Sequence, residues 1–139
     1  MSDLQAQNKA TISRFNKEFI ENGNLAVYDE IVSPKFHNHT SHDGRTPGPE
    51  GARHFFTQLL RPAFPDLKVT IHDQIAEGDQ VVTRKSYQAT HQGTFLGVPA
   101  TGKKISFTVI DIIKLRDGKY VEHWASADML GLLQQLKAG

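Results

Sequence analysis

The chain has 139 residues, of which 38% are hydrophobic and 22% charged, and its formal net charge is +1. These values predict one globular domain over residues 1–139, and the dispersed lysines and arginines argue against a nucleic-acid partner. The absence of cysteine excludes disulfides, thiolate chemistry and cysteine-ligated zinc. With no secretory signal pattern and no apolar run near the roughly 20 residues of a membrane span, we expect a cytoplasmic protein with no membrane partner.

The first third of the chain has the spacing of amphipathic helices. Five apolar residues recur along one face of the first helix: Leu4, Ile12, Phe15, Phe19 and Ile20. Residues 22–24 end it, and a second helix is expected over residues 25–32. Residues 36–39 predict a short extended segment, and the polar residues 40–48 predict a mobile loop. Pro49 opens a third helix that is expected to run to residue 63.

The remainder reads as strands. Period-two patterns predict strands over residues 67–72, 81–91, 105–115 and 120–127. Turn signals lie at residues 77–80 and 116–119, residues 92–102 form a long irregular connection, and residues 129–136 predict a closing helix. Helices grouped before an antiparallel meander predict an α+β fold, with the helices on one face of a curved sheet.

Two charged residues interrupt apolar strand patterns. Arg84 follows Val81-Val82-Thr83, and Asp111 lies between two apolar pairs. A charge at a strand centre either faces solvent or needs a partner. We expect Arg84 and Asp111 to face a cavity within one polar network, with a solvent-facing Arg84 as the alternative. Alternation places Trp124 and Glu122 on one face of the last strand and His123 on the other.

Other catalytic patterns are missing from the sequence. The glycine-rich residues 93–102 lack the Gly-Lys-Ser/Thr ending of a phosphate-binding loop and precede a strand, so no nucleotide site is expected. No Gly-x-Ser-x-Gly nucleophile elbow is present. His37, His39 and His42 cluster in sequence but lack a clear carboxylate partner, so no metal site is predicted.

Several motifs together resemble the SnoaL-like polyketide cyclases, or ester cyclases, of the nuclear-transport-factor-2-like superfamily. The most specific are Gly97-Val98-Pro99-Ala100-Thr101-Gly102 and Glu122-His123-Trp124 followed by Asp128. The likeness covers nearly the whole chain. It implies an α+β cone, in which a curved antiparallel sheet packs on the N-terminal helices around a deep pocket, and it implies a homodimer formed through the sheet.

The resemblance also implies roles for single residues. Asp128 is the candidate general base, although an aspartate before Met-Leu-Gly-Leu-Leu is also a standard helix N-cap. His39 and Arg84 would orient the substrate or stabilise an enolate oxygen, and Asp111 would hold that network in place. Four residues are candidates for substrate binding at the pocket wall or rim: Phe64, His91, Phe95 and Trp124.

The function that follows is cofactor-free acid/base chemistry without a metal. The expected substrate is a hydrophobic, carbonyl-rich or polyketide-like small molecule that cyclises after loss of a C–H proton. Two alternatives stay open at this point. The pocket would hold a small hydrophobic ligand without turning it over, or the same fold would support an isomerase, dehydratase or epoxide hydrolase reaction.

Overall fold

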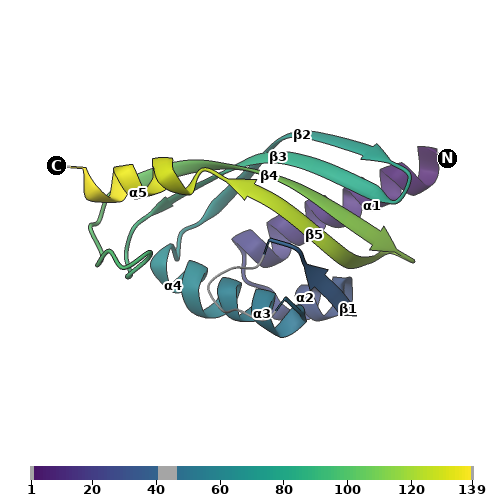
Figure 1. The fold of residues 1–139 in the computed structure, drawn as a ribbon, viewed down its shortest axis with the longest axis horizontal. Coiled ribbons are helices and arrows are strands. Elements are labelled where there is room, and N and C mark those ends of the chain that lie inside the picture. The colour runs from purple at the N-terminus through teal and green to yellow at the C-terminus, as the bar shows by residue number, and fades with distance from the viewer. Residues whose placement is uncertain (1, 41–46, 139) are drawn as a thin grey trace.

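The computed structural model of the chain describes residues 2–40 and 47–138. A five-stranded, strongly curved sheet lies over two groups of helices (Figure 1). The N-terminal helix α1 (Ser2–Arg14) continues as a π-helical segment, η1 (Phe15–Glu21), and α2 (Leu25–Ile31) follows. A second helical rod consists of α3 (Pro49–His54), the π-helical η2 (Phe55–Leu60) and α4 (Arg61–Ala63).

The three predicted helices are therefore present, and two of them contain a π-helical segment that the sequence pattern did not predict. Asn24 caps α2 by accepting a hydrogen bond from the Ala26 N–H at 3.1 Å, which satisfies one of the unpaired donors at the helix start. Pro49 occupies the first turn of α3, where its missing N–H is not needed. Most of the predicted loop at residues 40–48 lies outside the described residues, and so does the whole of His42.

The sheet has the strand order β1-β5-β4-β3-β2. Its antiparallel part comprises β2 (Lys68–Glu77), β3 (Gln80–Thr90), β4 (Lys104–Arg116) and β5 (Lys119–Ala127). These are the four predicted strands, although β2 is longer than its pattern suggested. The predicted extended segment is a fifth strand, β1 (Val32–Asn38), which pairs in parallel with β5.

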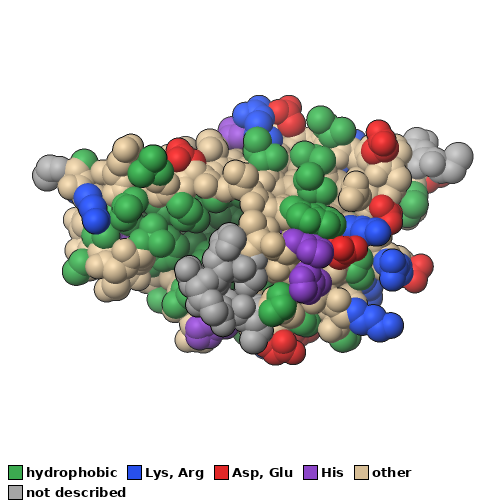
Figure 2. All heavy atoms as spheres, in the orientation of Figure 1, with side chains coloured by type: hydrophobic (Ala, Val, Ile, Leu, Met, Phe, Trp, Pro, Cys, Tyr) green, Lys and Arg blue, Asp and Glu red, His purple; other side chains and the backbone are tan. Residues whose placement is uncertain are grey.

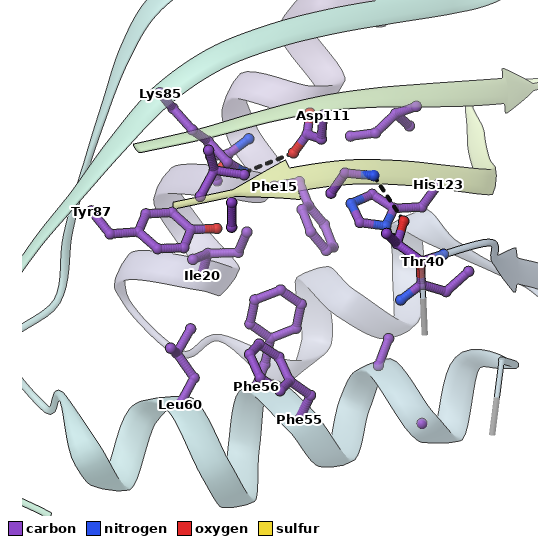
Figure 3. Close-up of a pocket in the computed structure, with 18 of the residues that line it drawn as sticks. Phe15, Ile20, Thr40, Phe55, Phe56, Leu60, Lys85, Tyr87, Asp111 and His123 are labelled. Atoms are coloured by element: carbon purple, nitrogen blue, oxygen red, sulfur yellow. Dashed lines mark hydrogen bonds and ion pairs between the residues drawn. The ribbon is translucent and has the colours of Figure 1, made fainter. Parts of the chain in front are cut away.

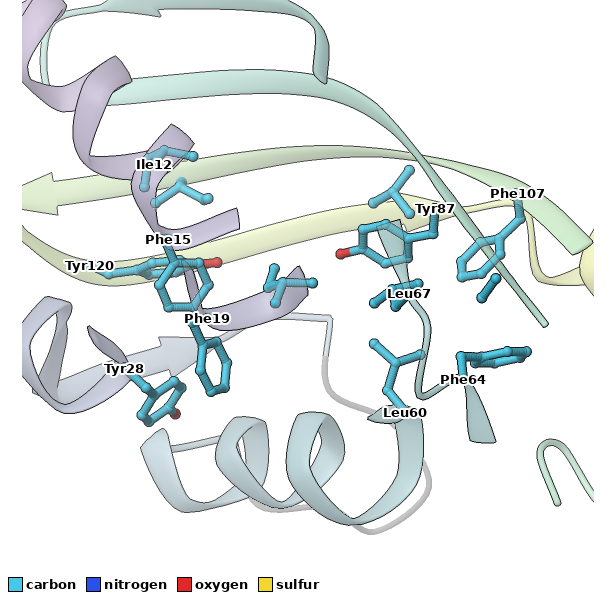
Figure 4. Close-up of a cluster of buried hydrophobic side chains, with 14 of the residues drawn as sticks. Ile12, Phe15, Phe19, Tyr28, Leu60, Phe64, Leu67, Tyr87, Phe107 and Tyr120 are labelled. Carbon is cyan, nitrogen blue, oxygen red and sulfur yellow. The ribbon is translucent and has the colours of Figure 1, made fainter. Parts of the chain in front are cut away.

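Alternation decides which side chains meet the helices. Along β4, the residues from Ile105 to Leu115 with odd numbers are buried, and those between them are mostly exposed. The inner face packs on the helices in a core of aromatic and aliphatic side chains (Figure 4). Phe19 lies at its centre, with ring centroids 5.3 Å from Phe15, 4.8 Å from Tyr28 and 5.4 Å from Phe56.

The closing helix α5 (Met129–Lys137) packs on β4 and buries Leu132 and Leu136. Its Gln135 side chain bonds both the N–H and the carbonyl of Ser106. In the described parts of the chain, no helix is both long and apolar enough to cross a membrane.

Candidate functional site

A cavity of about 480 Å³ lies between the inner face of the sheet and the helices. Figure 2 shows a hollow with hydrophobic side chains on its walls on this side of the molecule, and Figure 3 shows the interior. Both π-helical segments contribute to the wall, η1 and η2 with three residues each: Phe15, Asn16, Ile20, Phe55, Phe56 and Leu60. Such segments are frequent at functional sites, because they shift side chains out of the regular helical spacing.

A buried ion pair forms the charged centre of the cavity wall. Lys85 Nζ lies 3.0 Å from Asp111 Oδ2, and each side chain is only 3% exposed. The strand register explains the contact: Lys85 is paired with Val109 on β4, and Thr83 with Asp111. Lys85 and Asp111 are thus diagonal neighbours on the inner face, which is within the reach of a long side chain.

The Lys85 ammonium is held on several sides. Asn16 Oδ1 accepts a hydrogen bond from Lys85 Nζ at 2.6 Å, and Asn16 Nδ2 donates to the Ile12 carbonyl at 2.9 Å. Lys85 also lies over the ring of Tyr87, 5.3 Å from its centroid. Burial is the largest single influence and disfavours the charge, but the Asp111 carboxylate and Tyr87 together outweigh it and raise the pKa of Lys85 to about 12. The ammonium is therefore charged at neutral pH.

Two tyrosines add hydroxyl groups to the polar residues of the cavity wall. Tyr87 and Tyr120 both line the cavity, and burial is the main cause that raises the pKa of each phenol. Both hydroxyls therefore keep their protons at neutral pH and can donate hydrogen bonds to a ligand carbonyl.

His123 lies on the opposite side of the cavity from Tyr87 (Figure 3). Its register partner on β4 is Ile113, whose side chain is buried on the inner face. Its Nδ1 lies 3.0 Å from Asn38 Oδ1. Burial lowers the pKa of His123 to about 4, and the nearby Asp111 only partly opposes this. His123 is therefore neutral at pH 7.

Of the predicted catalytic residues, Asp111 lines this cavity and Asp128 does not. Asp128 is exposed and caps α5, accepting a hydrogen bond from the Gly131 N–H at 2.8 Å. The N-cap interpretation of Asp128 is thus confirmed. A Cβ on Gly131 would lie 2.2 Å from Asp128 Oδ2, so glycine lets this cap approach the helix closely.

Arg84 does not share a network with Asp111, which corrects the expectation that both face the cavity. Arg84 lies on the outer face, where its Nε contacts Asp73 Oδ2 at 2.7 Å and both side chains are more than half exposed. The reason is alternation along β3, because the inward position belongs to Lys85.

His39 and Trp124 also belong to the outer face. Trp124 is paired with Ile112, an outward residue of β4, and its ring stacks on His39 with centroids 4.5 Å apart. His39 Nε2 lies 2.9 Å from Glu122 Oε1, so it pairs with Glu122 and not with Asp128. Neither His39 nor Trp124 lines the cavity.

The remaining predicted binding residues divide between core and cavity. Phe95 lines the cavity, whereas Phe64 and His91 are fully buried outside its lining. His91 fastens the loop that follows β3: its Nδ1 lies 2.9 Å from Thr101 Oγ1 and accepts from the Thr101 N–H at 3.2 Å. Phe64 packs on both His91 and Phe95. Within residues 2–40 and 47–138, no three potential metal ligands come together.

Sequence reasoning missed Lys85 and His123 as cavity residues, together with three polar neighbours: Asn16, Tyr87 and Tyr120. A signal for Lys85 was available. On β3 the odd-numbered positions, which include Val81, Thr83 and Tyr87, are on the whole more apolar than the even-numbered ones. Lys85 is odd-numbered as well, so the alternation predicts that it points inward.

Comparison with known proteins agrees with this architecture. The family model of the SnoaL-like polyketide cyclases matches residues 10–136. The aklanonic acid methyl ester cyclase DauD of Streptomyces sp. strain C5 is 25% identical over 125 residues, which cover 86% of this chain and 78% of that protein.

Solved structures match over nearly the full length. A protein of Jannaschia sp. CCS1 assigned to the SnoaL-like polyketide cyclases superposes with a TM-score of 0.87 at 28% identity, covering 100% of this chain and 97% of that one. TsrD of Streptomyces laurentii gives 0.85 at 29% identity, covering 97% and 98%. The α+β fold is nuclear-transport-factor-2-like, and the chain belongs to the SnoaL-like polyketide cyclase family.

Proposed function

We propose that this protein is a cofactor-free enzyme that closes a ring in a hydrophobic, carbonyl-rich small molecule after removing a C–H proton next to a carbonyl. The observation that carries the proposal is the convergence of Lys85, Asp111 and His123 on one apolar cavity. Its volume of about 480 Å³ lies in the range of small-molecule sites, roughly 300–1,000 Å³.

The polar residues suit the charge changes of such a reaction. Removal of the proton moves negative charge onto the carbonyl oxygen, and preorganised donors in a dry site stabilise that charge. The hydroxyls of Tyr87 and Tyr120 are such donors, and the Lys85 ammonium adds a positive field. Asp111 holds Lys85 in place through their ion pair. The aromatic walls bind the apolar body of the substrate.

A trial substrate follows from the relative DauD, which is named for aklanonic acid methyl ester. The protein is incubated with that ester in D₂O, and mass spectrometry follows deuterium uptake and ring closure. Cyclised product is the expected result, and deuterium at the carbon next to the carbonyl in unreacted ester would show that removal of its proton is reversible. Retention of the intact ester without uptake, seen by native mass spectrometry, would replace catalysis with ligand binding.

Narrowing the cavity should stop turnover. Val109 lies on the inner face and lines the cavity, and the adjacent Thr108 is exposed on the outer face. We expect Val109→Phe to reduce the rate of ring closure at least tenfold, since the larger ring occupies substrate space, whereas Thr108→Phe retains it. Equal rates in the two folded variants would place the reaction outside this cavity.

We also propose that two copies associate through the outer face of the sheet. An apolar row crosses four strands in consecutive register positions: Ile75, Val82, Ile112 and Trp124. Figure 2 shows hydrophobic side chains crossing the sheet to meet histidines. A contiguous exposed apolar patch marks an interaction surface, and within this row Ile75 is 65% and Ile112 36% exposed.

A second copy suits this face because both charge signs border the row. The Arg84–Asp73 pair borders the row on β2 and β3, and the Lys114–Glu122 pair borders it on β4 and β5. We expect a dimer in light-scattering chromatography, and Ile112→Lys should shift it to monomer because the charge would be buried between two sheets. A monomeric wild-type protein at all concentrations would contradict the proposal.

A further inference from the structure

The side chain of Asn38 accepts two hydrogen bonds at one atom. Asn38 Oδ1 lies 2.9 Å from the backbone N of Thr40 and 3.0 Å from Nδ1 of His123. A backbone N–H can only donate, so the Asn38 atom at this position is the oxygen. An amide oxygen can only accept, and the proton of the neutral His123 ring is therefore on Nδ1.

The tautomer leaves Nε2 of His123 with a free lone pair. No hydrogen-bond partner for Nε2 occurs among the described residues, and this nitrogen is not among their buried unpaired atoms. Since His123 lines the cavity, the lone pair is accessible to a ligand there. Adjacent backbone bonds fix the arrangement: the His39 N–H donates to the His123 carbonyl at 2.8 Å, and the Ala125 N–H to Thr40 Oγ1 at 2.8 Å.

Asp111 is the competing proton acceptor in the cavity, and its geometry is less suitable. Its Oδ2 is engaged by the Lys85 ammonium at 3.0 Å. Its Oδ1 is buried without a hydrogen-bond partner among the described residues, so a substrate reaches it only after the wall moves.

We infer that His123 Nε2 is the proton acceptor of the reaction and that Asn38 is the positioning residue that sets its tautomer. This inference rests on the proposed function. The C–H proton moves to Nε2, and the bonding electron pair becomes the enolate. The enolate carbon then bonds to a second carbonyl carbon of the same molecule, whose oxygen takes the proton back from Nε2. The histidine is regenerated, and no other reactant is consumed.

The groups around His123 are consistent with a transient imidazolium. Asp111 on β4 favours the protonated ring, whereas Lys85 on β3 and His39, directly after β1, disfavour it. A proton acceptor that is neutral at rest and faces a carboxylate can hold a proton briefly and release it.

Nitrogen NMR tests the tautomer without any substrate. In protein labelled with ¹⁵N histidine at pH 7, we expect a protonated Nδ1 and an unprotonated Nε2 for His123. Asn38→Leu should abolish this preference, whereas Asn38→Asp retains the acceptor and should preserve it. A protonated Nε2, or a doubly protonated ring, in the wild-type protein would overturn the inference.

Kinetics with aklanonic acid methyl ester test the role. His123→Asn keeps a donor toward Asn38 but removes the acceptor at Nε2, and we expect it to lower kcat about 10²–10⁴-fold. The matched control is His39→Asn on the outer face, which should retain activity. Asn38→Asp should raise the acid-limb pKa of kcat/KM by about 1–2 units, since a nearby negative charge favours the imidazolium.

The outcomes separate the inference from the function on which it rests. No cyclised product from the wild-type protein would remove the proposed function, and the NMR result would still decide the tautomer. Full activity in His123→Asn, with ring closure by the wild type, would leave the function in place and remove His123 as the acceptor. An unchanged pH profile in Asn38→Asp would contradict the positioning role.

Discussion

Replacing Lys85 with methionine is expected to lower the free energy of unfolding by about 3–5 kcal/mol, because the Asp111 carboxylate would be left buried without its counter-ion. Both side chains are 3% exposed, so water does not replace the lost partner. Asn16 Oδ1 would also lose the hydrogen bond that it accepts from Lys85 Nζ. Urea unfolding at pH 7 followed by circular dichroism measures the change.

The neighbouring Arg84 is a matched control. It lies on the same strand, but its ion pair with Asp73 is more than half exposed, and exposed pairs contribute about 0–1 kcal/mol. Arg84→Met should therefore have a small effect. Adding Asp111→Asn to Lys85→Met should recover part of the loss, because the uncompensated charge disappears. A loss below 1 kcal/mol for Lys85→Met alone would show that the pair is not buried as described.

Stability should also fall steeply as the pH drops from 6.5 to 4, and His123 accounts for about 3 kcal/mol of that fall. Burial lowers its pKa from 6.5 to about 4 in the folded chain, a difference of 2.5 units at about 1.36 kcal/mol each. Between these values the unfolded chain binds a proton that the folded chain does not, so stability decreases with decreasing pH. Above pH 6.5 the histidine is neutral in both the folded and the unfolded chain, so this loss of stability is absent there.

The variant His123→Asn isolates this contribution. Carboxylates whose pKa is lowered by their partners, such as Glu21 through Lys17 and Asp66 through Thr90, lose stability at lower pH in both proteins. Only the wild-type protein should lose the additional free energy of unfolding that His123 contributes between pH 6.5 and 4. Urea unfolding curves at half-unit intervals give both slopes, and parallel slopes would mean that the histidine titrates normally in the folded state.

Much of the fold was predictable because its signals are local. Period-two patterns identified the four antiparallel strands, and helical spacing identified the three N-terminal helices. The parallel pairing of β1 with β5 was not predictable, because it joins residues about 85 positions apart and depends on where the chain returns. The π-helical segments were missed because they are only seven and six residues long, which is too short for an apolar pattern to separate i→i+5 from i→i+4 bonding.

The candidate site was only partly predictable. Asp111 was found because a charge among apolar strand residues is conspicuous, and its inward position is confirmed. Arg84 was chosen over Lys85 by the same criterion, although the parity of β3 favoured Lys85. His123 and Trp124 were correctly placed on opposite faces of β5, but the face that meets the helices was not known.

The sequence by itself determined the α+β class, the family and the alternation along each strand, because these depend on residue types at short separations. Only the tertiary structure decided which face of the sheet is covered by helices. That choice places Lys85, Asp111 and His123 around a cavity, and it leaves Arg84, His39 and Trp124 outside. The physical reason is that burial and charge pairing arise only when the sheet packs on the helices. The sequence of a single strand shows which residues share a face, but not which face is covered.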